Sequence, residues 1–291
     1  MSGPLLVADV PFLLYRGFFA LPSSIRGAQG NPVNALLGSV NNLLRVVQEV
    51  APRATVACLG AEDAPYRVAL YGGYHAARPP MPPELRWQFE RAPGLLAALG
   101  WQVEQSAELE ADDLLGSLAA VESAAGGRTL ILTGDRDMYQ CVSASVSVLY
   151  LKQGASGFES VDVAEVQRRY GVAPELVPDF IALRGDPSDG LPGAPGIGEK
   201  TAAQLLARHG SLEAVIAAGA SERPRVAAAL AEHAHALRAY REIALLRTVD
   251  LTRPADNAID HAAGAAAAAA LGMGQLSERL RAAGAAAPLR G

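Results

Sequence analysis

Acidic side chains recur in this 291-residue chain where strands are expected to end or helices to begin. The densest group starts at Glu110, and apolar residues follow it at helical spacing. Asp112 and Asp113 therefore lie in the first turn of a predicted helix, whose dipole favours negative charge. Carboxylates held this close repel one another unless something positive lies between them. The stretch fits either a solvated helix start or one corner of a metal site.

Further acids follow other predicted strands. Asp9 ends the apolar run that begins at Leu5, and two acids follow the apolar run 129–133. A parallel sheet brings the ends of such strands to one edge. A turn-rich segment after residue 184 adds two more acids. The full set comprises Asp9, Glu110, Asp112, Asp113, Asp135, Asp137, Asp186 and Asp189.

These acids form a set of hard, all-oxygen ligands, because no Cys or His accompanies them. Oxygen ligands favour Mg²⁺ or Mn²⁺ over zinc. Two such ions roughly 4 Å apart can activate a water and stabilise the leaving oxygen at a phosphodiester. We therefore expect a pocket for two or more divalent ions.

The remaining pattern alternates between strand and helix. Apolar runs predict strands over residues 5–10, 54–59, 129–133 and 146–151, and helical periodicity predicts helices over 32–50, 163–170 and 174–183. This order is typical of an α/β fold with a mostly parallel sheet flanked by helices. We expect Tyr15 and Arg16 in a loop, and a loosely ordered, Ala-rich tail beyond Pro254.

The overall composition argues against a strongly basic nucleic-acid-binding protein, a disulfide-rich protein and a membrane-spanning protein. A net charge of −5 gives no global basic field for nucleic acid, so any such binding needs local patches. Two cysteines form no disulfide framework, which fits a reducing, cytoplasmic setting. We find no signal peptide and no run with the length and hydrophobicity of a membrane span.

Two other segments have the composition of nucleic-acid contacts. Residues 61–94 interleave Arg with Tyr and Trp around a Pro-rich break, which fits either a mobile surface loop or an arch over a single strand. The run Gly196 to Thr201 is not a P-loop, because Glu199 separates Gly198 from Lys200. It fits a helix-hairpin-helix turn whose amides hold a backbone phosphate, or an ordinary Gly-rich helix start.

With these residues in place, the chain resembles the bacterial 5′–3′ exonuclease and flap endonuclease family, which also forms the N-terminal domain of many bacterial DNA polymerases of the first type. The motifs LLVADVPFLLYRGFFAL, YRVALYGGY, LEADDLLGSLA, LILTGDRDMYQ and RGDPSDGLPGAPGIGEKTA occur in family order. The resemblance implies a PIN-like nuclease domain at 1–175 with a helical arch at about 61–94, a helix-three-turn-helix duplex-binding domain at 176–255, and a tail at 256–291.

The resemblance also implies roles for individual residues. It implies that the eight acids bind or support Mg²⁺ or Mn²⁺, and that Arg16 and Arg67 lie near the scissile phosphate. It implies a monovalent cation such as K⁺ at the duplex-binding turn, and a monomer acting on DNA 5′ flaps or 5′ ends, with RNA–DNA hybrids as a further substrate. The implied DNA contacts are Tyr71, Tyr74, His75, Arg78, Gly196, Gly198, Lys200 and Thr201.

Two positions depart from the family pattern. Gly60 stands where the second strand usually ends in Asp, and His75 stands where the arch usually has Lys. Asp63 can replace the missing acid only if the loop bends back. We expect weaker metal binding, a preference for Mn²⁺ and altered cleavage. The alternative is a branched-DNA-binding paralogue with little or no cleavage, rescued by Gly60→Asp with His75→Lys. A ribonuclease of the wider PIN group is the third hypothesis.

Overall fold

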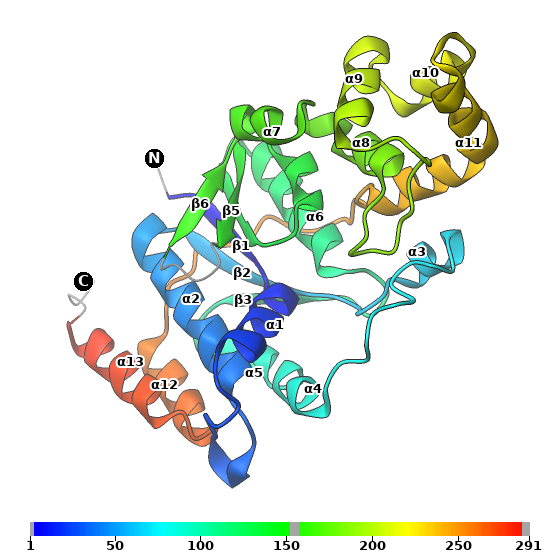
Figure 1. The fold of residues 1–291 in the computed structure, drawn as a ribbon. Coiled ribbons are helices and arrows are strands. Elements are labelled where there is room, and N and C mark those ends of the chain that lie inside the picture. Colours follow the sequence, from blue (N-terminus) through cyan, green and yellow to red (C-terminus); the bar gives the residue numbers. More distant parts are fainter. Residues whose placement is uncertain (1–2, 152–156, 287–291) are drawn as a thin grey trace.

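The computed structural model describes residues 3–151 and 157–286, which form one six-stranded sheet with helices on both faces (Figure 1). The strand order is β3-β2-β1-β4-β5-β6, and only β6 runs antiparallel to its neighbour. This confirms the predicted α/β class; β6 was not predicted. The strands are β1 Leu5–Asp9, β2 Ala54–Leu59, β3 Gln102–Gln105, β4 Thr129–Thr133, β5 Val146–Leu151 and β6 Phe158–Val161.

The central strand β1 fixes where the acids emerge. Leu5 pairs with Ala54 of β2 on one side and with Thr129 of β4 on the other. All three strands are mostly apolar and almost entirely buried, as is typical of parallel strands between helical layers. Their carboxyl ends therefore meet at one edge of the sheet.

Two apolar cores cover the two faces of the sheet, one on each side. One face carries α1 Val10–Ala20, α2 Asn34–Val50, α4 Pro83–Phe89 and α5 Ala92–Ala98. On the other face, α6 Ala111–Ala124 packs on β1, β2 and β4, and α7 Val163–Tyr170 contacts β6. The remaining helices of this core pack on one another and extend away from the sheet (Figure 1): α8 Val177–Arg184, α9 Glu199–His209, α10 Leu212–Ala217 and α11 Pro224–Ala244. The short helix α3 Pro65–Leu70 contacts α11, and 3₁₀ turns occupy Ala28–Gly30, Asp137–Cys141, Pro174–Leu176 and Gly219–Ser221.

Helix α1 corrects the expectation of a loop around Tyr15 and Arg16. Asp9 caps the helix by accepting a 2.9 Å hydrogen bond from the Phe12 amide, and Pro11 suits the first turn. The residue that ends β1 therefore also starts α1, and its carboxylate is held at the edge of the sheet.

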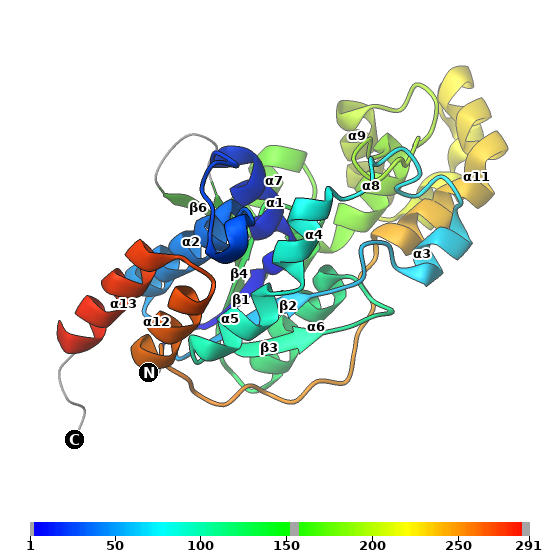
Figure 2. The ribbon, with the colours of Figure 1, turned by 90° about the horizontal axis from the view of Figure 1, so that it is seen from below.

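Residues 256–286 of the C-terminal tail are also ordered, contrary to prediction. They form the helices α12 His261–Ala270 and α13 Gly274–Ala286, which pack on each other and on α5. Alanine has the highest helix propensity, and Met273, Leu276 and Leu280 are buried. The low average hydrophobicity of the tail gave no sign of these buried contacts. An extended connecting segment, residues 245–260, leads from α11 to α12 (Figure 2).

None of the helices described is long and apolar enough to cross a membrane.

Candidate metal centre

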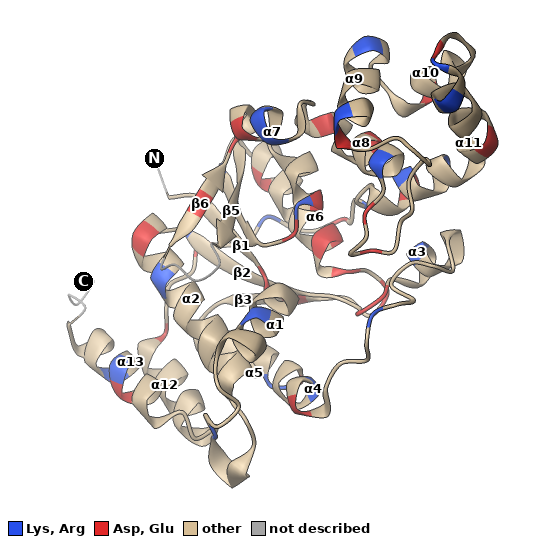
Figure 3. Ribbon diagram, in the orientation of Figure 1, with Lys and Arg blue, Asp and Glu red and all other residues tan. Residues whose placement is uncertain are grey.

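A cavity of about 1250 Å³ opens at the carboxyl edge of the sheet. Figure 3 shows acidic segments at the start of α6 and in the chain beside it. Seven of the eight predicted acids line this cavity, and only Asp113 does not. Basic and aromatic residues line it as well: Arg67, Tyr74, His75, Arg78, Arg136 and Arg184.

Four of these acids have no basic ion-pair partner among the residues described. Asp9, Asp112, Asp135 and Asp137 form no ion pair with any residue in the described ranges. Asp9 accepts hydrogen bonds from the Phe12 amide and, at 2.6 Å, from the Thr133 hydroxyl. Asp135 accepts one from the Asp137 amide at 2.8 Å.

Their electrostatics follow from burial and mutual repulsion. Burial raises the pKa of Asp9. Burial, and then repulsion by Asp135, raises the pKa of Asp112 and that of Asp137 well above the usual range. Burial and repulsion by Asp189 raise the pKa of Asp135 to about 7. A divalent cation bound among these carboxylates would relieve the repulsion.

The residues fit such a cation by their chemistry. In residues 3–151 and 157–286, no group of three or more His, Cys, Asp or Glu side chains is arranged to hold a metal ion. The donors at the cavity are nevertheless carboxylate oxygens, the ligands that Mg²⁺ and Mn²⁺ prefer.

The other cavity acids already have partners. Glu110 forms an ion pair with Arg67 and accepts hydrogen bonds from the Ala64 amide and the Tyr74 hydroxyl. Asp186 lies 3.3 Å from Arg184 and accepts a hydrogen bond from the Ser188 amide. Asp189 lies 3.2 Å from the His75 ring and 3.0 Å from the Arg78 guanidinium.

Gly60 lies against the start of α6. A Cβ at Gly60 would stand 2.3 Å from the Ala111 amide nitrogen and 2.5 Å from the Glu110 Cα. No side chain fits there unless α6 shifts, so the geometry opposes the expected rescue by Gly60→Asp. Asp63 lines the cavity, but its carboxylate faces His75 at 2.6 Å.

His75 links the arch to the loop that carries Asp189. Its backbone is left-handed, with φ of 53°, and its ring stacks on Tyr74 at 3.7 Å. The Nδ1 atom faces Asp63 and the Nε2 atom faces Asp189. Carboxylate oxygens only accept, so both contacts are hydrogen bonds when both nitrogens carry hydrogen, which is the cationic ring.

Two predicted contacts, Tyr71 and Arg16, lie apart from the lining of the cavity. Tyr74 and Arg78 line the cavity, whereas Tyr71 packs on Tyr240 at 5.2 Å. Arg16 lies on α1, outside the lining residues described. We did not predict Arg136 or Arg184, yet each stands beside a predicted acid in the sequence, which is the signal that could have identified them.

The predicted phosphate-binding turn leads into α9. Gly196 has φ of +80°, which favours glycine, and a Cβ there would approach the Arg225 guanidinium at 2.9 Å. Helix α9 begins at Glu199, with Lys200 and Thr201 in its first turn. Gly198 at the N-cap has no side chain to cap the first amides, so they remain open to a ligand.

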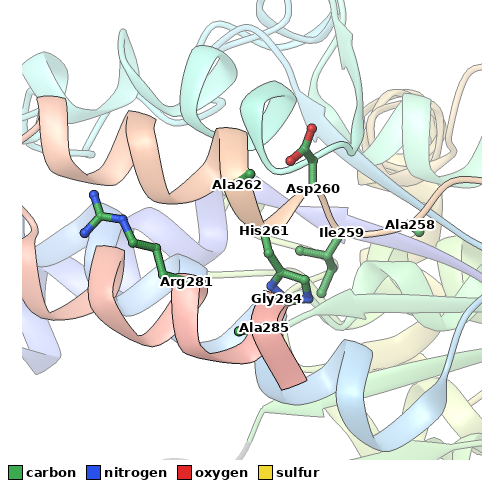
Figure 4. A pocket seen from close by; sticks show the side chains of 8 residues that line it. All are labelled: Ala258, Ile259, Asp260, His261, Ala262, Arg281, Gly284 and Ala285. Atoms are coloured by element: carbon green, nitrogen blue, oxygen red, sulfur yellow. The ribbon is translucent and has the colours of Figure 1, made fainter. Parts of the chain in front are cut away.

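A second cavity, of about 660 Å³, lies between α12, α13 and the chain before them (Figure 4). Asp260, His261 and Arg281 line it, and none of the predicted site residues does.

The fold belongs to the PIN-like nuclease type. It superposes on T5 5′-exonuclease with a TM-score of 0.65 and 14% identity, over 97% of this chain and 99% of that chain. A bacteriophage T5 flap endonuclease solved with DNA and metal ions gives 0.69 and 14%, over 96% and 98%. The catalytic core of Rad2 with DNA substrate gives 0.64 and 14%, over 97% and 91%.

Family models match most of the chain. Residues 4–171 match the 5′-3′ exonuclease N-terminal resolvase-like domain, and residues 172–263 match the 5′-3′ exonuclease C-terminal SAM fold. This chain belongs to the 5′–3′ exonuclease family, which confirms the resemblance seen in its motifs.

Curated relatives include both free-standing nucleases and polymerases. A 5′-3′ exonuclease of Mycobacterium tuberculosis is 38% identical, with 82% of this chain and 81% of the relative covered. One of Streptomyces coelicolor is 40% identical, over 73% and 74%. DNA polymerase I of Mycobacterium leprae is 38% identical over 87% of this chain, but the chain spans only 28% of that relative.

Proposed function

We propose that this chain is a divalent-metal-dependent, structure-specific 5′–3′ exonuclease and flap endonuclease acting on DNA. One observation carries the proposal. Asp9, Asp112, Asp135 and Asp137 come from three separate parts of the chain, yet they line one cavity without a basic partner among the residues described. Family membership and the DNA and metal ions named for the T5 flap endonuclease support it.

These four carboxylates are the proposed holders of Mg²⁺ or Mn²⁺, with Glu110, Asp186 and Asp189 supporting them. Bound ions of this kind supply an activated water and a Lewis acid for the leaving oxygen. Asp113 is proposed to support the site from behind. Gly196 and its neighbours are the proposed position of a monovalent cation such as K⁺.

Two arginines supply donors for substrate phosphate. The Nε atoms of Arg67 and Arg184 are buried and have no hydrogen-bond partner in the described structure. Both residues line the cavity. Because an unpartnered buried donor is costly, each Nε favours an incoming acceptor such as a phosphate oxygen. Arg16 stays a predicted phosphate contact.

The substrate is proposed to be DNA with a 5′ flap or a 5′ end, with RNA–DNA hybrids as a second class. The open amides at α9, with Lys200 and Thr201, would hold the duplex backbone without reading sequence. Tyr74, His75 and Arg78 would face the strand that enters the cavity. We further propose a cytoplasmic monomer that acts in replication and repair.

A 5′-flap duplex incubated with Mg²⁺ or Mn²⁺ tests the proposal. We expect products with a 5′-phosphate and a 3′-hydroxyl, and we expect Asp112→Asn to abolish them while the exposed control Asp250→Asn cuts normally. Absence of product with either metal across pH 6 to 9 would reject the nuclease.

A branched-DNA-binding paralogue remains the second candidate, because Gly60 supplies no carboxylate to a metal ion and Glu110 already forms an ion pair with Arg67. Tight flap binding without turnover in the same assay would favour it. Equal cutting of unstructured RNA would instead indicate a ribonuclease.

A further inference from the structure

Asp112 and Asp113 are neighbours in the first turn of α6 but occupy opposite environments. Asp112 lines the cavity, whereas Asp113 is 0% exposed and does not line it. The Asp113 carboxylate accepts hydrogen bonds from four groups in the rest of the chain. The donors are Arg67 Nη2 at 3.2 Å, the Tyr66 hydroxyl at 3.3 Å, the Arg247 amide at 2.8 Å and the Glu110 amide at 3.3 Å.

A carboxylate offers about four lone-pair sites, so these donors saturate Asp113. Binding a metal ion would require the carboxylate to give up buried hydrogen bonds, each of which leaves an unsatisfied donor. The neighbouring Asp112 has no such set of donors in the part of the chain that the structure describes. Only one of the two adjacent acids is therefore available to a cation.

Three parts of the chain meet at this carboxylate. Tyr66 and Arg67 come from α3 at the base of the arch, Glu110 comes from the start of α6, and Arg247 comes from the connecting segment after α11. The Arg247 guanidinium lies 3.4 Å from the centre of the Tyr66 ring. The Ser117 hydroxyl, one turn along α6, holds the Val249 amide at 2.9 Å.

We propose that Asp113 is a positioning residue and not a metal ligand. It fixes Arg67 and the first turn of α6 relative to each other, and it ties both to the chain that leaves the duplex-binding helices. The proposal deepens the proposed nuclease function and rests on it. The resemblance to the family had placed Asp113 among the acids that bind or support the metals, and the contacts assign it to support.

Calorimetric titration with Mn²⁺ separates the two roles. We expect Asp112→Asn to weaken Mn²⁺ binding at least tenfold, and Asp113→Asn to leave it within about threefold. Asp113→Asn should still lower kcat for flap cleavage about tenfold or more, with KM little changed, because Arg67 loses one of its two carboxylate partners. Equal loss of Mn²⁺ binding in both variants would overturn the proposal, as would an unchanged kcat in Asp113→Asn.

Milder variants keep the proposal testable if Asp113→Asn does not fold. Tyr66→Phe removes one donor, and Arg247→Gln removes the ring contact. We expect both to speed amide hydrogen exchange in residues 65–70 and to lower kcat about threefold, as the loss of one hydrogen bond in Tyr66→Phe or of one exposed cation–π contact in Arg247→Gln would. Arg253→Gln is the matched control, because Arg253 lies on the same connecting segment but binds Glu122.

The control should lower the Tm without changing α3 exchange or kcat. If Tyr66→Phe and Arg247→Gln behave like this control, the contacts at Asp113 are merely structural and the proposal fails. Failure of the proposed function looks different, because the wild-type chain would then cut no DNA while metal titration and hydrogen exchange still report on Asp113.

Discussion

Gly60 is one of the two positions at which the sequence departs from the expected family pattern. Because its backbone touches the start of α6, we predict that Gly60→Asp lowers the free energy of unfolding by about 1–3 kcal/mol, as overpacked positions do. Urea unfolding measures this. Gly94→Ala is the control, since nothing lies within 4 Å of a Cβ at that exposed helical position, and it should be neutral or stabilising. Undiminished stability with tighter Mn²⁺ binding in Gly60→Asp would contradict the contact.

Asp135 gives metal binding a dependence on pH. Its pKa of about 7 means that the carboxyl is largely protonated at pH 6 and ionised at pH 8. A cation must displace that proton, so the apparent affinity for Mn²⁺ should rise from pH 6 to pH 8, with proton release greatest near pH 6. Calorimetry in buffers of different ionisation enthalpy measures both quantities. An affinity that is flat over this range would show that Asp135 is not a ligand.

At the scale of elements, the connecting segment is held by one buried acid. Glu122 on α6 is buried and binds Arg53 and Arg253, and Arg53 also reaches the Pro254 carbonyl at 2.8 Å. We predict that Glu122→Gln costs about 3 kcal/mol, because it leaves the buried Arg53 with only the exposed Asp256 as an acidic partner. The control Glu213→Gln, at an exposed pair with Arg238, should change little. Denaturant unfolding of both variants checks this.

The same acid predicts sensitivity to low pH. Burial raises the pKa of Glu122, but hydrogen bonds from Arg253 and Arg53 outweigh it and lower the pKa from 4.5 to about 2. The stability that Glu122 contributes is therefore complete above pH 4.5 and is lost as pH falls towards 2. In this window the wild type should lose stability more steeply than Glu122→Gln. Parallel slopes would remove Glu122 as the cause.

The elements also show what sequence could predict. Strands β1, β2 and β4 were recognisable because a buried parallel strand is a continuous apolar run. Helix α1 was missed because its periodicity is weak and its start depends on the Asp9 cap. In the site, composition found the acids, but it could not separate Asp112 from Asp113. That difference depends on Tyr66, Arg67 and Arg247, which only tertiary folding brings together.

At the scale of the whole molecule, repulsion at the cavity should oppose folding when no metal is present. We predict that Mn²⁺ at about 100 times its Kd stabilises the protein by about 2.7 kcal/mol and raises the Tm by several degrees over EDTA. Asp135→Asn should raise the Tm in EDTA, because it removes one repelling charge, and should blunt the response to Mn²⁺. Thermal scans of both proteins with and without metal test this. A Tm in EDTA that falls in Asp135→Asn would refute the repulsion.

The helix pair α12 and α13 determines when one of the two apolar cores can be completed during synthesis. Ala265, Ala268, Leu276 and Leu280 belong to the same apolar core as Leu13 and Leu36. The ribosome makes Leu13 and Leu36 more than two hundred residues before these four. During synthesis that early surface stays uncovered until α12 and α13 emerge from the ribosome. Such surfaces recruit chaperones or aggregate. The nascent protein should therefore depend on holding factors until both helices have been made.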